Sequence, residues 1–219
     1  MIFVNFKTYK QGSGEEAIAL VKTIGEVAQE AQIKIIPVLQ AADIKEAVTA
    51  SKLEIWVQNI DTETYGAHTG AVLPEAVKED GASGTFLNHS EIKFPDFNDL
   101  KMAVKRAIEV NLKTLVFASD ISELEKVLTL KPTYVAYEPP ELIGSKTESV
   151  AGAKADIIAK AVVVSKEAGV PLVVGAGVKS TEDVRKSIEL GAVGVAVASD
   201  IVLARDPKKE LLDLIEGFK

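Results

Sequence analysis

The chain has 219 residues, of which 47% are hydrophobic and 5% aromatic, and its formal net charge is −7. This composition is typical of a globular protein long enough to bury a full core in one or two domains. The negative charge argues against a general nucleic-acid or anionic-membrane surface, and the absence of cysteine excludes disulfides, thiolate catalysis and cysteine metal sites. No apolar stretch approaches the ~20 residues of a membrane span, and the N-terminus enters a strand without a signal peptide, so we expect a cytoplasmic protein with no membrane partner.

In chain order, short apolar runs that favour strands alternate eight times with longer amphipathic stretches that favour helices. The predicted strands are Ile2–Phe6, Ile33–Val38, Leu53–Val57, Gly84–Leu87, Thr114–Phe117, Tyr134–Tyr137, Leu172–Val174 and Val193–Val197. The predicted helices lie near Glu15–Ala31, Ala42–Ser51, Pro74–Glu79, Asn98–Val110, Ser122–Leu130, Ala155–Ala168, Thr181–Leu190 and Lys208–Phe218. Capping residues support several boundaries, with Asn98, Ser122 and Ser180 at helix starts and Gly169 and Gly191 just after helix ends.

Eight strand–helix units predict an α/β fold in which residues 1–219 form a single barrel of eight parallel strands ringed by helices. An open, doubly wound sheet is the alternative. The barrel is favoured because the unit count is eight. It also gathers the ends of the first, fourth and sixth strands around one mouth, whereas an open sheet would spread them along an edge.

Three chemically apt residues follow those strand ends: Lys7 after the first, His89 after the fourth and Glu138 after the sixth. A glutamate at the end of a buried strand lies partly out of water, which raises its pKa toward that of a useful base. Taken singly, these residues are more often a surface lysine, a core histidine and a solvated loop acid. A cation, an imidazole and a carboxylate at three strand ends together indicate one site.

Two loops carry signals for an anionic ligand. Gly175, Ala176 and Gly177 follow the seventh strand, and Ala198 and Ser199 follow the eighth and enter a short helical stretch. Glycine permits close approach of the backbone, and amides at a helix start favour anions. Because the loops after strands seven and eight of such a barrel commonly bind phosphate, these residues favour a phosphorylated ligand.

Several motifs, in the same order along nearly the whole chain, resemble the compact archaeal branch of the triosephosphate isomerase family, the family after which the TIM barrel is named. They are Asn5-Phe6-Lys7; Gln58-Asn59 with Gly66-Ala67-His68-Thr69-Gly70; Asn88-His89-Ser90-Glu91; Tyr137-Glu138-Pro139-Pro140-Glu141-Leu142-Ile143-Gly144; Gly175-Ala176-Gly177; and Ala198-Ser199. The resemblance implies interconversion of dihydroxyacetone phosphate and glyceraldehyde 3-phosphate through an enediolate, in glycolysis and gluconeogenesis.

By this resemblance, Glu138 is the base that moves a proton between two substrate carbons. His89 is a neutral imidazole that polarises the carbonyl and moves protons between the substrate oxygens, and a helix N-terminus lowers its pKa. Lys7 supplies positive charge, Asn5 a hydrogen bond to a substrate oxygen, and Glu91 holds Lys7. The residues implied to bind substrate phosphate are Gly144, Ser145, Gly175, Ala176, Gly177, Ala198 and Ser199.

The resemblance also implies a homodimer or homotetramer, formed through a loop at 59–70 that carries Gly66, His68 and Thr69 and inserts beside Lys7 of a neighbouring subunit. That loop is longer than a simple connection needs. No metal or organic cofactor is expected, since proton transfer beside a carbonyl requires only a base, an acid and an electrostatic cradle.

Three positions depart from the family pattern: Lys146 stands where a glycine is usual, Asp200 where a small residue is usual, and Ile92 where a polar or basic residue forms a salt bridge. For Asp200, an outward helix cap is favoured over a carboxylate that faces the phosphate. Two alternatives to an active isomerase stay open. One is another sugar-phosphate enzyme on the same barrel. A Schiff-base aldolase, however, commonly has its lysine at the end of the sixth strand, where this chain has Glu138, and two histidines are few for a metal-dependent epimerase. The other is a paralogue or redesign that binds without efficient turnover.

Overall fold

The computed structural model of the protein describes residues 1–140 and 155–219. Eight parallel strands pair in chain order and close into a barrel. The strands are β1 (Ile2–Asn5), β2 (Ile35–Leu39), β3 (Trp56–Val57), β4 (Gly84–Leu87), β5 (Lys113–Ala118), β6 (Tyr134–Tyr137), β7 (Leu172–Val174) and β8 (Gly194–Val197). The predicted barrel is therefore confirmed, and the open sheet is excluded because β8 pairs with β1.

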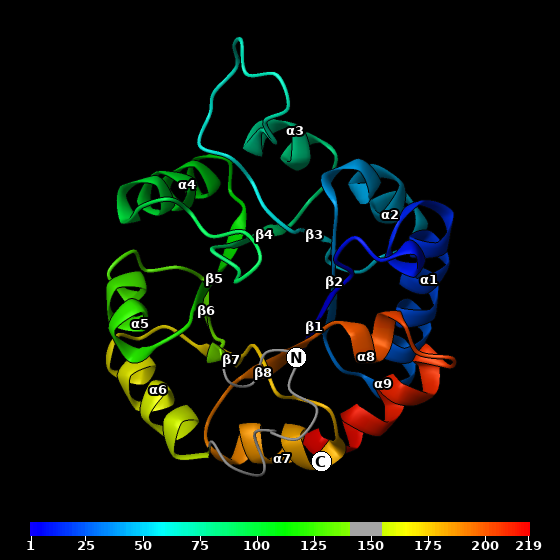
Figure 1. Ribbon diagram of the computed structural model, residues 1–219. Helices are drawn as coiled ribbons and strands as arrows, with labels where there is room; N and C mark the ends of the chain where they lie inside the picture. The colour runs from blue at the N-terminus through cyan, green and yellow to red at the C-terminus, as the bar shows by residue number, and fades with distance from the viewer. Residues whose placement is uncertain (141–154) are drawn as a thin grey trace.

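Helices follow the strands and form the outer ring of the molecule (Figure 1). They are α1 (Gly14–Ala31), α2 (Ile44–Ala50), α3 (Pro74–Glu79), α4 (Phe97–Glu109), α5 (Ile121–Leu128), α6 (Ala155–Glu167), α7 (Thr181–Glu189), α8 (Ser199–Val202) and α9 (Pro207–Ile215), with 3-10 turns at Lys10–Gly12, Ala41–Asp43 and Glu216–Phe218. Within the described ranges, no helix combines the length and the apolarity needed to cross a membrane.

Side-chain alternation along the strands divides the core into two parts. In β1, Ile2 and Val4 pack toward the helices, whereas Phe3 belongs to the cluster inside the barrel. That inner cluster consists of Phe3, Ile36, Val38, Trp56, Phe86, Leu115, Phe117, Ala136, Val173 and Ala196. Two residues beyond an inner position, the same alternation places the next side chain at the carboxyl mouth of the barrel.

Two predicted strands differ from the observed ones by more than one residue at an end. The second begins two residues later and ends one later than expected, and the third contains only Trp56 and Val57, because only these two residues pair with β2 and β4. Leu53, which was expected to open the third strand, packs instead against the outer part of the core.

Helix caps show how local chemistry sets the boundaries. Asp96 caps α4 through the amides of Asn98 and Asp99, and Asp120 caps α5 through the amide of Glu123. The predicted caps Asn98 and Ser122 are therefore wrong, since earlier aspartates already satisfy these amides. Ser180 does cap α7, with its hydroxyl accepting from the amide of Asp183. Gly169 and Gly191 have φ values of +72° and +101°, as expected after helix ends.

The connection from β3 to α3, residues 58–73, projects away from the barrel (Figure 1). We refer to it as the β3 loop. It is tied together at its base, where the Asp61 amide donates to the Val72 carbonyl at 2.9 Å and the Val72 amide donates to the Asp61 carboxylate at 2.7 Å. From Thr64 to Gly70 every residue of the loop is exposed.

Candidate active site

The mouth of the barrel is built by the alternation that fills its interior. Asn5, Glu138, Gly175 and Ala198 each lie two positions beyond an inner-cluster residue. A cavity of about 50 Å³ opens here, lined by Asn5, Lys7, Phe86, His89, Phe117, Gly175, Ala196, Val197 and Ala198. A second cavity, of about 180 Å³, shares Asn5, Lys7, Phe86 and His89 and extends over Thr8, Gln58, Glu91 and Ile92. Lys7 and His89 line both cavities, and Glu138 Oε1 lies 3.6 Å from His89 Nε2, so the three strand ends predicted to form one site do converge.

Lys7 is held in a left-handed backbone conformation, with φ +48°. Such a conformation costs a non-glycine residue about 1–3 kcal/mol and persists only where its surroundings fix it. Here the Lys7 amide donates to Asn5 Oδ1 at 3.0 Å, and Gln58 Nε2 donates to the Lys7 carbonyl at 2.9 Å. The ammonium forms an ion pair with Glu91 Oε1 at 2.6 Å. Sequence reasoning had given Gln58 no role in holding Lys7.

His89 is buried and lies between two charged partners. Its Nδ1 accepts from the Glu91 amide at 3.2 Å, so the proton of the neutral ring is on Nε2. Nε2 lies 3.6 Å from Glu138 Oε1. The ring packs edge-on against Phe117, with centroids 4.8 Å apart. This geometry presents an N–H toward the mouth and the carboxylate.

The pKa of His89 is lowered to about 4, chiefly because burial penalises the imidazolium; the charge of Glu91 opposes the shift and that of Lys7 adds to it. The amide that faces Nδ1 belongs to a single turn closed by the Ile92 amide and the His89 carbonyl at 2.9 Å. The resemblance implied a helix N-terminus as the cause, whereas here burial is the larger effect. The ring is neutral at physiological pH.

Glu138 follows β6 directly and is 6% exposed. Its amide donates to the Ala118 carbonyl at 2.8 Å, which continues the strand ladder by one residue and fixes the side chain at an inward position. Burial raises the pKa of Glu138, while hydrogen bonds from Ser90 and the charge of Lys7 oppose the rise. Oε2 accepts from the Ser90 amide at 3.4 Å. Sequence reasoning missed Ser90, because this contact depends on a main-chain group presented by a distant turn.

Gly175, directly after β7, lies close to Glu138, the predicted base. A Cβ at Gly175 would lie 3.2 Å from the Tyr137 carbonyl oxygen and 3.3 Å from Glu138 Cβ, closer than most side chains tolerate. Gly177 has φ +76°, which suits glycine. Ala176 is buried between them. Gly175 therefore leaves room for the carboxylate side chain, besides any approach of a ligand to the loop.

At the end of β8, Ala198 is the N-cap of α8 and makes no side-chain cap hydrogen bond. Ser199 and Asp200 are the first two residues of that helix, and both are exposed. The expectation that Asp200 caps the helix is wrong, because the cap position falls two residues earlier. Its exposure agrees with the outward orientation that was favoured.

Other predicted positions lie away from this mouth. Gly66, His68 and Thr69 are exposed on the projecting β3 loop, so a single chain does not bring them to the cavity. Gly144, Ser145 and Lys146 lie outside the described residues.

The family profile described as triosephosphate isomerase matches residues 1–217 of the chain. The chain belongs to the triosephosphate isomerase family. It is 41% identical to the triosephosphate isomerase of Methanobacterium bryantii over 217 residues, which cover 98% of this chain and 95% of that one. It is 39% identical to that of Methanothermus fervidus, with 98% and 97% coverage. The resemblance inferred from the short motifs is confirmed.

The fold of the family extends to more distant structures. The crystal structure of triosephosphate isomerase from Bartonella henselae superposes with a TM-score of 0.75 at 16% identity, covering 99% of this chain and 96% of that one. At this identity the likeness supports the triosephosphate isomerase fold, and the 3.6 Å approach of His89 to Glu138 supplies the chemical detail.

Proposed function

We propose that this chain interconverts dihydroxyacetone phosphate and glyceraldehyde 3-phosphate, with Glu138 as the base that moves a proton between the two carbons. The observation that carries the proposal is the pairing of two buried groups with shifted pKa values. Glu138, with a raised pKa, lies 3.6 Å from the Nε2–H of His89, whose pKa is lowered to about 4. A carboxylate base and a neutral imidazole donor are the two groups that enolisation of a hydroxy ketone requires.

In the first step, the Glu138 carboxylate removes a proton from C1 of dihydroxyacetone phosphate. The C–H electron pair forms the C1–C2 double bond, and the carbonyl electrons move onto the C2 oxygen. His89 donates its Nε2 proton to that oxygen and takes one from the C1 hydroxyl. Glu138 then returns its proton to C2, which yields the aldehyde without net change in the protein.

Lys7 and Asn5 stabilise the negative charge that develops on the oxygens. The Lys7 ammonium, oriented by Glu91, supplies positive charge in the cavity that His89 also lines. Asn5 Oδ1 already accepts the Lys7 amide, so its Nδ2 is the group left to donate to a substrate oxygen. One asparagine thereby supports the strained lysine and contacts the ligand.

The phosphate is proposed to bind across the loops that follow β7 and β8. The amides of Gly177 and Ser199 are the donors; the first amides of a helix have no intrahelical acceptor. Gly175, Ala176 and Ala198 shape the same edge of the mouth, and Gly144 and Ser145 are expected to contribute from the segment outside the described residues. The reaction needs no metal or organic cofactor, because base, acid and electrostatic stabilisation suffice.

We further propose that the protein is a homodimer or homotetramer assembled through the β3 loop, with Gly66, His68 and Thr69 at the contact. The exposure of residues 64–70 and of Tyr65, which is 67% exposed, supports this. An aromatic side chain at the tip of a projecting loop suits a protein partner better than solvent.

A coupled isomerase assay on the purified protein, run in both directions, tests the function. Turnover of both trioses is the expected result. Absence of turnover above the uncatalysed rate in a folded protein would reject the proposal and leave the paralogue that binds without catalysis.

A further inference from the structure

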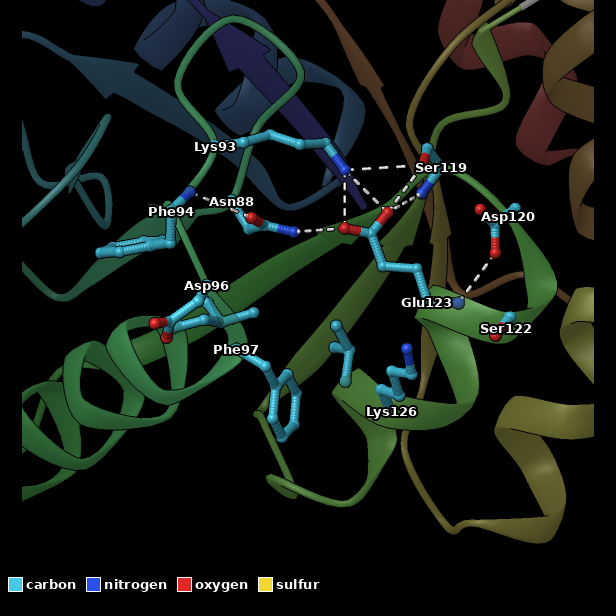
Figure 2. Close-up of a pocket in the computed structure, with 12 residues that line it drawn as sticks. Asn88, Lys93, Phe94, Asp96, Phe97, Ser119, Asp120, Ser122, Glu123 and Lys126 are labelled. Carbon is cyan, nitrogen blue, oxygen red and sulfur yellow. Dashed lines mark hydrogen bonds and ion pairs between the residues drawn. The ribbon is translucent and has the colours of Figure 1, made fainter.

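A second polar network lies behind the mouth, between α4 and α5, beside a cavity of about 380 Å³ (Figure 2). Its centre is Glu123 in the first turn of α5, a residue that the proposed reaction does not use. The carboxylate of Glu123 accepts hydrogen bonds from Lys93 Nζ at 2.6 and 2.7 Å, from the amide and hydroxyl of Ser119 at 2.7 Å each, and from Asn88 Nδ2 at 2.9 Å.

Two of these donors belong to the segment that carries the proposed acid, residues 88–94, which we name the β4 turn. Asn88 opens it with φ +61° and is 4% exposed. The Asn88 side chain also donates to the Phe117 carbonyl at 3.0 Å and accepts from the Phe94 amide at 3.3 Å (Figure 2). Asn88 therefore ties the two ends of the turn to each other and to β5, and Glu123 holds both Asn88 and Lys93.

The β4 turn presents three groups to the site described above. His89 is the proposed donor, the Ser90 amide contacts the Glu138 carboxylate at 3.4 Å, and Glu91 pairs with Lys7. A shift of the turn displaces all three at once. Phe117 links the two parts, because its carbonyl accepts a hydrogen bond from Asn88 Nδ2 and its ring packs against the His89 ring.

Glu123 is suited to hold the turn because its carboxylate is ionised at neutral pH. Burial alone would raise the pKa of Glu123, but hydrogen bonds from Lys93, Ser119 and Asn88 outweigh burial and lower it to about 2. The Glu123 carboxylate accepts five hydrogen bonds, and both of its oxygens take part. A group that donates therefore cannot replace either oxygen without loss of a hydrogen bond.

We infer that Glu123 is a positioning residue, which fixes the β4 turn through Asn88 and Lys93 and so aligns His89 and Ser90 with Glu138. This rests on the proposed isomerase function for its effect on turnover. The geometric part, that Glu123 determines the environment of His89, does not depend on that function.

The informative substitution is Glu123→Gln, which keeps the shape of the side chain. One oxygen becomes an NH₂ group that faces the donors Lys93, Ser119 or Asn88, so at least one hydrogen bond is replaced by a repulsive contact. We expect kcat to fall by roughly 10- to 100-fold, because misplacing a catalytic group by about 1 Å costs on the order of 100-fold. KM should change less, since the β4 turn does not carry the proposed phosphate donors.

The chain contains only two histidines, so NMR of protein labelled in histidine follows His89 directly, with His89→Gln for assignment. In the wild type, His89 should titrate near pH 4. In Glu123→Gln, its pKa should move upward toward the ordinary value of 6.5, as the loosened turn admits water. The charged groups that face the ring, Lys7, Glu91 and Glu138, are unchanged in this variant.

Two controls separate positioning from general stability. Glu125→Gln makes the same chemical change on an exposed residue of the same helix and should leave kcat and the His89 titration unchanged. Ser119→Ala removes the hydroxyl that donates to Glu123 and that accepts from Lys93 Nζ at 3.5 Å, but it leaves the shorter contacts of Lys93 and Asn88 with Glu123 in place, so it should lower stability with little effect on kcat. If Glu123→Gln does not fold, Lys93→Gln removes the cation that links the turn to Glu123 and is expected to act in the same direction.

A fall in kcat together with an upward shift of the His89 titration, in a variant that unfolds cooperatively, would support the inference. An unchanged His89 titration, or an unchanged kcat, in folded Glu123→Gln would overturn it. Should the wild-type protein show no isomerase activity, the proposed function fails, and the His89 titration alone still decides whether Glu123 positions the turn.

Discussion

The β3 loop and the β4 turn follow neighbouring strands and lie at the same end of the barrel, yet they are anchored differently. In the β4 turn, Asn88 and His89 are buried, and Glu123 anchors the segment from α5. The β3 loop is hydrogen-bonded at its base, while its tip from Thr64 to Gly70 is exposed.

This difference separates what one chain supplies from what the proposed assembly would add. The β4 turn fixes an imidazole and an amide relative to Glu138 with contacts that lie within the chain. The β3 loop exposes Tyr65 to solvent, and a second copy would cover it. Substitutions in the β4 turn and its partners should therefore change chemistry, whereas substitutions in the β3 loop should change association first.

The largest effect is expected for Glu138→Gln. Loss of the general base should lower kcat by roughly 100- to 10,000-fold, while the fold is retained. The coupled assay measures turnover, and circular dichroism measures folding, with Glu125→Gln as the control. Retention of more than about a tenth of wild-type turnover would remove Glu138 from the role of base.

The same variant should also be more stable at neutral pH. Because burial raises the pKa of Glu138, the folded state binds its proton more tightly than the unfolded chain does. The favourable contribution is fully present below the unfolded pKa of about 4.5 and is lost as the pH rises through the higher folded pKa. Glutamine carries no such penalty, so thermal unfolding at pH 7 should shift upward by a few degrees, on the order of 2–4 °C per kcal/mol. A lower unfolding temperature would contradict this reading of burial.

A smaller loss is expected for Lys7→Met, which removes the ammonium but keeps the length of the side chain. Removal of one charge-stabilising donor typically costs about 100- to 1,000-fold in rate, so kcat/KM should fall within that range. Lys10→Met is the control, since the Lys10 side chain is 86% exposed. Equal losses in the two variants would show that the ammonium of Lys7 has no special role.

The β3 loop is tested by Tyr65→Lys, which places a charge at the exposed tip. If the loop forms the interface, loss of an aromatic contact should weaken association by about tenfold or more. Sedimentation velocity at micromolar concentration measures the assembly, with Val163→Lys on α6 as an exposed hydrophobic control. A wild-type protein that is monomeric at this concentration and fully active would reject both the interface and the need for it.

The smallest effect is expected for Asp200→Gly. Because Asp200 is exposed in the first turn of α8, its charge is screened by salt, and KM should change by less than about twofold. Steady-state kinetics at low and physiological ionic strength measure this. A drop in KM of about tenfold or more, largest at low salt, would show that the carboxylate faces the phosphate.

The sequence was sufficient to predict the barrel and the convergence of Lys7, His89 and Glu138. Strand alternation and closure of an eight-stranded sheet leave little choice about where residues just after the strands lie. The same local signals placed Ser180 and Gly169 correctly. In regular secondary structure, the position of a residue in space can therefore be predicted from its position in the sequence.

The contacts that were missed involve groups without a sequence signature. The Ser90 amide reaches Glu138, and the Asn88 side chain reaches Glu123, because Asn88 adopts a left-handed conformation that redirects the turn. Main-chain donors exist at nearly every residue, so their use depends on a geometry that periodicity does not specify. The caps Asp96 and Asp120 were missed for a simpler reason. The predicted helices began too late, at Asn98 and Ser122, so the aspartates just before them were not considered as caps.

Transfer of a carbon-bound proton by Glu138 can be followed directly in D₂O. A proton held on the Glu138 carboxyl group between the two steps exchanges with solvent, so glyceraldehyde 3-phosphate formed from dihydroxyacetone phosphate should carry deuterium at C2. Trapping the aldehyde by oxidation as it forms prevents return, and NMR of the trapped product measures the label. The wild type should give deuterated product, and Glu138→Gln should lose both turnover and label. Labelled product formed at an undiminished rate by Glu138→Gln would contradict proton transfer through Glu138, whereas wild-type product free of deuterium would show only that the carboxyl proton returns to C2 before it exchanges.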